Sequence, residues 1–145
     1  MHKRFSNVSV ALLVAAVVCA CSSSHNAKAP ATLPGGTAQL TINDGTSRQT
    51  DTVNCLPMGW LTRVTTGETA ASITALLSSE NALSAKSVNI NDVDGFTGSY
   101  MEGLQGEAYV SMNGRTYTIR GTAEGFSRDK PDVRTTGKFV IEIAC

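Results

Sequence analysis

The segment Glu107–Arg120, "EAYVSMNGRTYTIR", decides the fold. Two runs of alternating apolar and polar residues flank Asn113-Gly114, a preferred two-residue turn because both of its positions need positive φ. Such a loop places Val110 opposite Tyr117, with the apolar pairs on one face of the hairpin and the polar pairs on the other. A slipped register would lose this separation. The segment therefore predicts an antiparallel β hairpin in that register.

Most of the chain after residue 36 has the same two-residue alternation. In the last segment, "KFVIEIAC", Phe139, Ile141, Ile143 and Cys145 share one face, which is typical of a half-buried strand. Further strands are predicted, between turn-rich loops, at 38–42, 48–55, 60–64, 88–90 and 96–101. Together these patterns predict a mainly antiparallel sheet.

One segment, "ETAASITALLSSENAL", has helical spacing instead. Ala70, Ile73, Leu76 and Leu77 form one stripe among good helix formers. We therefore predict a helix over Thr69–Ser79, with its apolar stripe against the sheet. The expected fold class is α+β: a small, mainly antiparallel β domain with one short helix packed on the sheet and one disulfide.

The N-terminus has the features of a secretory signal. Lys3 and Arg4 precede an apolar run at positions 8–18, which is shorter than the roughly 20 residues that span a bilayer. The run ends at Val18 and continues as "CAC", which is similar to the bacterial lipobox, in which a cysteine receives diacylglycerol and a peptidase cuts just before it. Residues 1–20 are thus predicted to be a lipoprotein signal peptide and Cys21 the lipidated residue. The alternative is an ordinary signal cut elsewhere, with Cys21 as a free thiol.

Residues 21–36, "CSSSHNAKAPATLPGG", show no apolar periodicity and predict a flexible tether. Residues 37–145 then form a single globular domain. Loss of Lys3 and Arg4 with the signal leaves ten basic and twelve acidic residues, a mature charge of about −2. Nucleic acids and polybasic membrane contacts both require clustered positive charge. We therefore expect no nucleic-acid partner, and contact with the membrane only through the lipid anchor.

The four cysteines divide according to this processing. Cys19 leaves with the signal and Cys21 carries the lipid, so Cys55 and Cys145 remain as an even pair. In an oxidising compartment such a pair is most simply one disulfide. The alternative is two free thiols. A zinc site would need more ligands than the chain offers.

The expected domain lacks the residues of the common catalytic sites. His2 lies in the signal and His25 in the tether, so the domain contains no histidine for Ser-His or Cys-His catalysis. Asp92, Asp94 and Gly95 suggest a calcium loop, but the required carboxylate at its first position is missing, and a hairpin turn is the better interpretation. We predict no catalytic, metal or cofactor site.

Several features together resemble the mycobacterial nineteen-kilodalton lipoprotein antigen family over nearly the whole mature chain. They are the lipobox, the tether, Cys55 and the segments "LLSSENALSAKSVNINDVDGFTGSY", "YTIRGTAEGF" and "KFVIEIAC". The resemblance implies a palmitate-bearing cell-envelope antigen acylated at Cys21, with Cys55 and Cys145 as its disulfide pair. It also implies lipid-dependent recognition by a host pattern-recognition receptor, Toll-like receptor 2. The tether here is short, with few hydroxyl groups for the glycosylation that family members carry.

The first functional hypothesis is a monomeric, membrane-anchored surface lipoprotein without enzyme activity or cofactor, which acts through its lipid and its exposed surface. The alternative is a periplasmic carrier or chaperone that binds an apolar ligand between helix and sheet, which needs a cavity there. An enzyme, which would require a convergent carboxylate pair, ranks lowest.

Overall fold

The computed structural model describes residues 32–145, so the predicted signal peptide, Cys21 and most of the predicted tether lie outside the described residues. The described range contains ten strands and no helix. The strands are β1 (Ala38–Ile42), β2 (Arg48–Thr50), β3 (Val53–Met58), β4 (Leu61–Gly67), β5 (Ser72–Ser78), β6 (Ser84–Val93), β7 (Phe96–Met101), β8 (Glu107–Asn113), β9 (Thr116–Ser127) and β10 (Lys130–Ala144).

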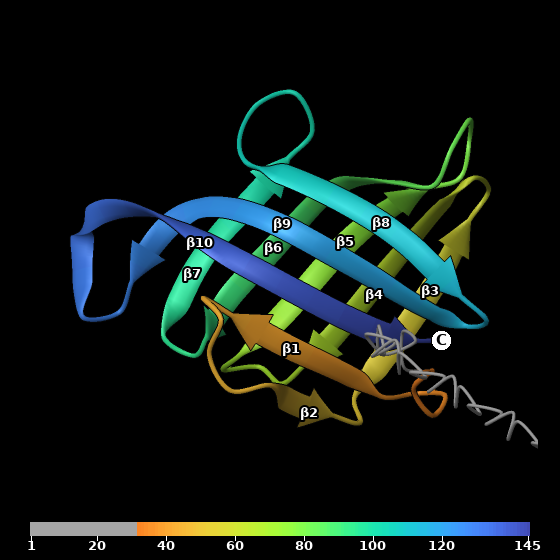
Figure 1. Cartoon of the computed structure of the whole chain (residues 1–145), viewed down its shortest axis with the longest axis horizontal. Coiled ribbons are helices and arrows are strands. Elements are labelled where there is room, and N and C mark those ends of the chain that lie inside the picture. Colours follow the sequence, from red (N-terminus) through yellow and green to blue (C-terminus); the bar gives the residue numbers. More distant parts are fainter. Residues whose placement is uncertain (1–31) are drawn as a thin grey trace, which may run out of the picture.

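All ten strands belong to one antiparallel sheet that folds over itself. The order is β2-β1-β10-β9-β7-β6-β5-β4-β3, with β8 paired to β9 off this path. Strand β9 changes partners along its length: residues 116–122 pair with β8, and residues 124–127 pair with β7. As Figure 1 shows, β1, β8, β9 and β10 cross in front of β3 to β7. The two layers enclose the core between them.

The helix predicted over Thr69–Ser79 is wrong, and the fold class is all-β rather than α+β. Strand β5 occupies this segment, between β4 and β6. Ile73 and Leu77 are four residues apart, so they share a face in a helix and in a strand alike. Ala75, which is also buried, shares that face only in a strand, where side chains repeat every two residues. Strands β4 and β6 provide hydrogen-bonding partners along both edges, and this tertiary pairing outweighs the local helix propensity.

The predicted hairpin is present, but its register differs by two residues. Val110 lies opposite Ile119 instead of Tyr117. The two loop residues are Gly114 and Arg115, with Gly114 at a φ of 58°. A two-residue shift leaves every side chain on its predicted face, because side chains alternate with a period of two. The alternation pattern therefore excludes a one-residue slip but not this register.

Phe96, which is 2% exposed, packs against two glycines: Gly98 on its own strand β7 and Gly137 on β10. A Cβ atom at Gly137 would lie 2.5 Å from Cζ of Phe96, and one at Gly98 would lie 2.7 Å from the same atom. Both distances are too short for any side chain. The ring therefore requires glycine at both positions. Around it lies a continuous buried cluster from both layers, whose largest members include Leu40, Ile73, Leu77, Val88, Val93, Ile119, Phe139, Ile141 and Ile143.

We predict that Gly137→Ala lowers the free energy of unfolding by about 1–3 kcal/mol, because the added methyl group overpacks the core against Phe96. Urea unfolding followed by circular dichroism measures the change. Gly35→Ala is the matched control, because a Cβ atom there meets nothing within 4 Å and the residue does not need positive φ. Equal stability of Gly137→Ala and the parent protein would contradict this account of the core.

Candidate functional site

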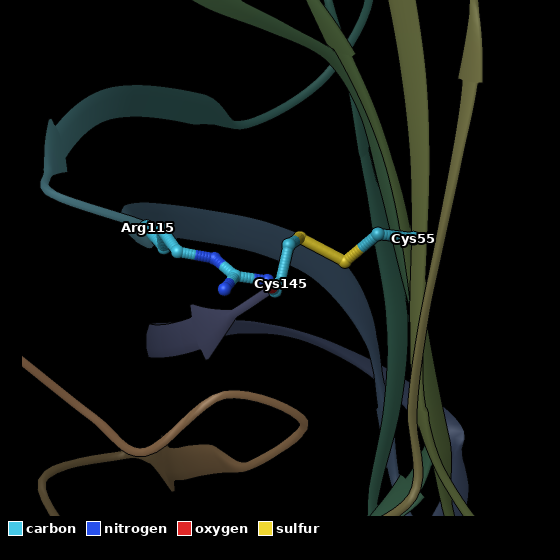
Figure 2. The surroundings of a disulfide bond; sticks show 3 residues. All are labelled: Cys55, Arg115 and Cys145. Atoms are coloured by element: carbon cyan, nitrogen blue, oxygen red, sulfur yellow. A yellow bond between two sulfur atoms is a disulfide. The ribbon is translucent and has the colours of Figure 1, made fainter.

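A disulfide joins the two cysteines that the sequence analysis paired. Cys55 of β3 is bonded to Cys145, which follows β10, with an S–S distance of 1.98 Å and a Cα–Cα distance of 5.9 Å (Figure 2). Strand β3 is the edge of the back layer and pairs with β4 alone, whereas β10 lies in the front layer. The bond therefore connects the layers where no β-ladder does.

Arg115 holds the last residue in place beside this bond, as Figure 2 shows. Its guanidinium donates a hydrogen bond to the carbonyl of Cys145, and its own carbonyl accepts one from the Cys145 N–H at 3.1 Å. Sequence reasoning missed this role and treated Arg115 as a strand residue next to the turn. No local signal could have identified it, because the contact depends on where β10 ends.

The chain enters the domain at this same end. The Leu33 N–H donates to Oγ1 of Thr116 at 3.1 Å, and the Gly36 N–H donates to the Ala144 carbonyl at 2.9 Å. An apolar opening of about 480 Å³ adjoins the disulfide, and its lining includes Val53, Cys55, Pro57, Tyr117, Ala144 and Cys145. The approach from the tether, the C-terminus and the disulfide thus lie together at one end of the molecule.

The acidic turn between β6 and β7 is neutralised by arginines. Arg48 contacts Asp94 at 2.7 Å, and Arg128 forms an ion pair with Asp92. Asp94 and Gly95 have φ values of 51° and 79°, as expected for a tight hairpin turn. Within residues 32–145, no group of three or more His, Cys, Asp or Glu side chains lies close enough together to hold a metal ion.

Tyr100 is the buried ionisable side chain of the core, at 6% exposure. Its hydroxyl donates a hydrogen bond to the Ala85 carbonyl at 3.1 Å. Burial raises the pKa of Tyr100, with the Glu102 carboxylate as a smaller cause, because removal from water disfavours the phenolate. These contacts give Tyr100 a structural role.

This pKa shift predicts a loss of stability at alkaline pH. The folded-state pKa of Tyr100 lies above the ordinary value of 10.0, so above that pH the unfolded chain gives up its proton first and unfolding becomes more favourable. Tyr100→Phe should flatten the decline in unfolding free energy as pH rises above 10. Tyr109→Phe, which changes a tyrosine that is 67% exposed, should leave the decline unchanged. Equal slopes for Tyr100→Phe and the parent would contradict the prediction.

Loss of the disulfide should destabilise the domain strongly. The bond spans 90 residues, and closure of such a loop is worth roughly 4.5 kcal/mol in the chain-entropy model. We predict a loss of this order for the double variant Cys55→Ser/Cys145→Ser, measured by urea unfolding. The reduced parent protein is the control and should unfold at nearly the same urea concentration as the double variant. An unchanged midpoint in both would contradict a stabilising role for the bond.

These features define a class of protein: a small all-β domain in which one disulfide links the two layers of the sheet. Within the described part of the chain, no helix is long and apolar enough to cross a membrane.

Comparison with known proteins then gives the family. The family model described as Mycobacterium 19 kDa lipoprotein antigen matches residues 31–145, and the chain belongs to this family. A putative lipoprotein of Mycobacterium indicus pranii is 35% identical over 137 residues, which cover 93% of this chain and 94% of the relative. Probable lipoprotein LppE of Mycobacterium tuberculosis is 32% identical over 138 residues, covering 94% and 93%. Lipoprotein LpqH of Mycobacterium avium is 35% identical over 94 residues, covering 64% and 58%.

Proposed function

We propose that the protein is a non-catalytic lipoprotein held at the extracytoplasmic face of the cell membrane by acylated Cys21, with its β domain displayed in the envelope. Family membership supports a lipoprotein, and the lipobox-like sequence before Cys21 supports this cysteine as the anchor. One observation supports the display of the domain away from its anchor: the chain enters the domain beside the disulfide, through the contacts of Leu33 and Gly36.

This entry point orients the domain relative to its anchor. Thr32 lies eleven positions after Cys21, and a fully extended chain of that length reaches roughly 36–40 Å. The tether would then hold the domain by its disulfide end. The turn between β9 and β10, at the far left of Figure 1, points away from it. Loops at that far end are the surface that the anchored protein offers to its surroundings.

We propose further that the acyl chains, rather than the domain, are what a host pattern-recognition receptor such as Toll-like receptor 2 recognises. Two or more acyl chains give stable anchoring, whereas a single chain binds a membrane only reversibly. The proposed modification of Cys21 would therefore provide both the anchor and the receptor ligand.

The ligand site required by the carrier hypothesis is absent from the described residues. It placed an apolar ligand between a helix and the sheet, but residues 32–145 contain no helix. The space between the two layers is filled by side chains such as Ile73, Ile119 and Phe139, each at most 1% exposed. We therefore do not propose a ligand in the interior.

Cys21→Ala tests the anchor. This variant should move from the membrane fraction to the soluble fraction, and intact mass should show that it has lost the acyl groups. Cys19→Ala is the matched control two residues away and should remain in the membrane with its acyl mass unchanged. A Cys21→Ala protein that still fractionates with the membrane would contradict the proposal.

The same preparations test receptor recognition. Reporter cells that carry Toll-like receptor 2 should respond to the parent protein and to Cys19→Ala, and should not respond to Cys21→Ala. A full response to Cys21→Ala would place the recognised feature in the polypeptide.

A further inference from the structure

A groove of about 550 Å³ lies on the outer face of the sheet where β6, β7, β9 and β10 run side by side. One row of polar side chains crosses it. Asn89 lies opposite Ser99, Ser99 lies opposite Glu124, and Glu124 lies opposite Thr136. Asn89 alternates with buried neighbours along β6, so this row points away from the core.

A second row runs beside the first and contains an aromatic ring. Thr97 lies opposite Phe126, and Phe126 lies opposite Arg134. Phe126 is 39% exposed, and Asn91 also lines the groove. An accessible aromatic face therefore adjoins a line of hydroxyl, amide and charged groups.

The polar groups of the groove are largely held in place by one another. Gln105, from the loop after β7, donates from Nε2 to the Ser99 carbonyl at 3.1 Å and to its hydroxyl at 2.7 Å. Oε1 of Gln105 accepts from Arg134 at 3.5 Å. The Thr136 hydroxyl donates to the Glu124 carboxylate at 2.8 Å. These paired side chains therefore have little conformational entropy left to lose when a ligand binds.

Two amides in the groove are free to bind a ligand. The side chains of Asn89 and Asn91 belong to exposed residues, and neither has a hydrogen-bonding partner within residues 32–145. An amide offers both donors and an acceptor. A ligand that crosses the groove could therefore exchange paired hydrogen bonds with each of them.

We propose that this groove binds a neutral saccharide. Each sugar hydroxyl both donates and accepts, which matches the amides and hydroxyls of the groove, and the apolar C–H face of a sugar ring fits the exposed ring of Phe126. The charged groups Arg134, Glu124 and Asp132 include both signs, so the lining lacks the positive excess that phosphates require. The inference is independent of the anchor at Cys21.

A peptide strand suits the groove less well. Peptides commonly bind sheets by adding a strand to a free edge. At the groove, however, β6, β7 and β9 each have a paired strand on both sides. The groove therefore offers side chains and an aromatic face rather than backbone groups. Its position near the turn between β9 and β10, at the end away from the disulfide (Figure 1), keeps it accessible in an anchored protein.

The test is a titration of the full mature chain in a sugar-free detergent, followed through its backbone amide NMR signals. The probes are soluble tetrasaccharides of glucose, mannose, galactose and N-acetylglucosamine, with inorganic phosphate as a separate probe. We expect at least one tetrasaccharide to shift the signals of Asn89, Ser99 and Phe126. Phe126→Ala should weaken this binding about tenfold through the lost ring contact, and Asn89→Ala about fivefold through lost hydrogen bonds.

Tyr109→Ala is the matched control, because it removes an exposed aromatic ring from β8, outside the groove, and it should bind like the parent. Three outcomes would overturn the proposal. They are the absence of groove shifts with any tetrasaccharide, equal weakening by Phe126→Ala and Tyr109→Ala, or a response to phosphate alone, which would assign the groove to an anion.

Discussion

The bond between Cys55 and Cys145 closes a sheet that strand pairing alone leaves open. The strand order ends at β2 in the front layer and at β3 in the back layer. These two edge strands follow each other in the chain, separated by Asp51 and Thr52, and Thr52 hydrogen-bonds the Gly67 backbone at the end of β4. The disulfide adds a covalent link from β3 to the residue after β10. Because no ladder joins β2 to β3, this side of the enclosed core depends on that link.

The same folding of the sheet creates both the core and the groove. Strand β9 passes from β8 to β7 at Ala123, which is fully buried, and so belongs to both layers. On its inner side, the ring of Phe96 packs where Gly98 and Gly137 leave room. On its outer side, Glu124 and Phe126 line up with residues of β6, β7 and β10. One short stretch of β9 therefore packs against the core on its inner face and contributes side chains to the groove on its outer face.

The two ends of the molecule suggest separate roles. At one end lie the disulfide, the C-terminus and the entry of the chain that leads back to Cys21. At the other lie the β9–β10 turn and the saccharide groove that we propose (Figure 1). The lipid would account for anchoring and receptor recognition, and the domain would add a binding surface at a distance from the membrane. Membership of the chain in the 19 kDa lipoprotein antigen family agrees with a role for the lipid. The proposed saccharide groove is argued only from this domain's own residues.

Much of this protein follows from its sequence alone, because the relevant signals are local. The hairpin around Asn113-Gly114, the last strand and the even cysteine pair can all be recognised from neighbouring residues or from a count. Long-range pairing decided the rest. Ile73 and Leu77 suit a helix as well as a strand, and only the presence of β4 and β6 on both sides makes the segment a strand.

Tertiary structure alone also decided the hairpin register and the groove. The alternation on each side of Asn113-Gly114 repeats every two residues, so two registers satisfy it equally and the chain's wider packing selects one of them. The groove joins Asn89, Ser99, Glu124 and Arg134, which are 45 positions apart at the extremes and meet only through the sheet order. Patterns within one segment reveal which face of a strand is buried. Except across a tight hairpin turn, they do not identify the strand that lies beside it, because hydrogen bonds between backbones depend little on the side chains.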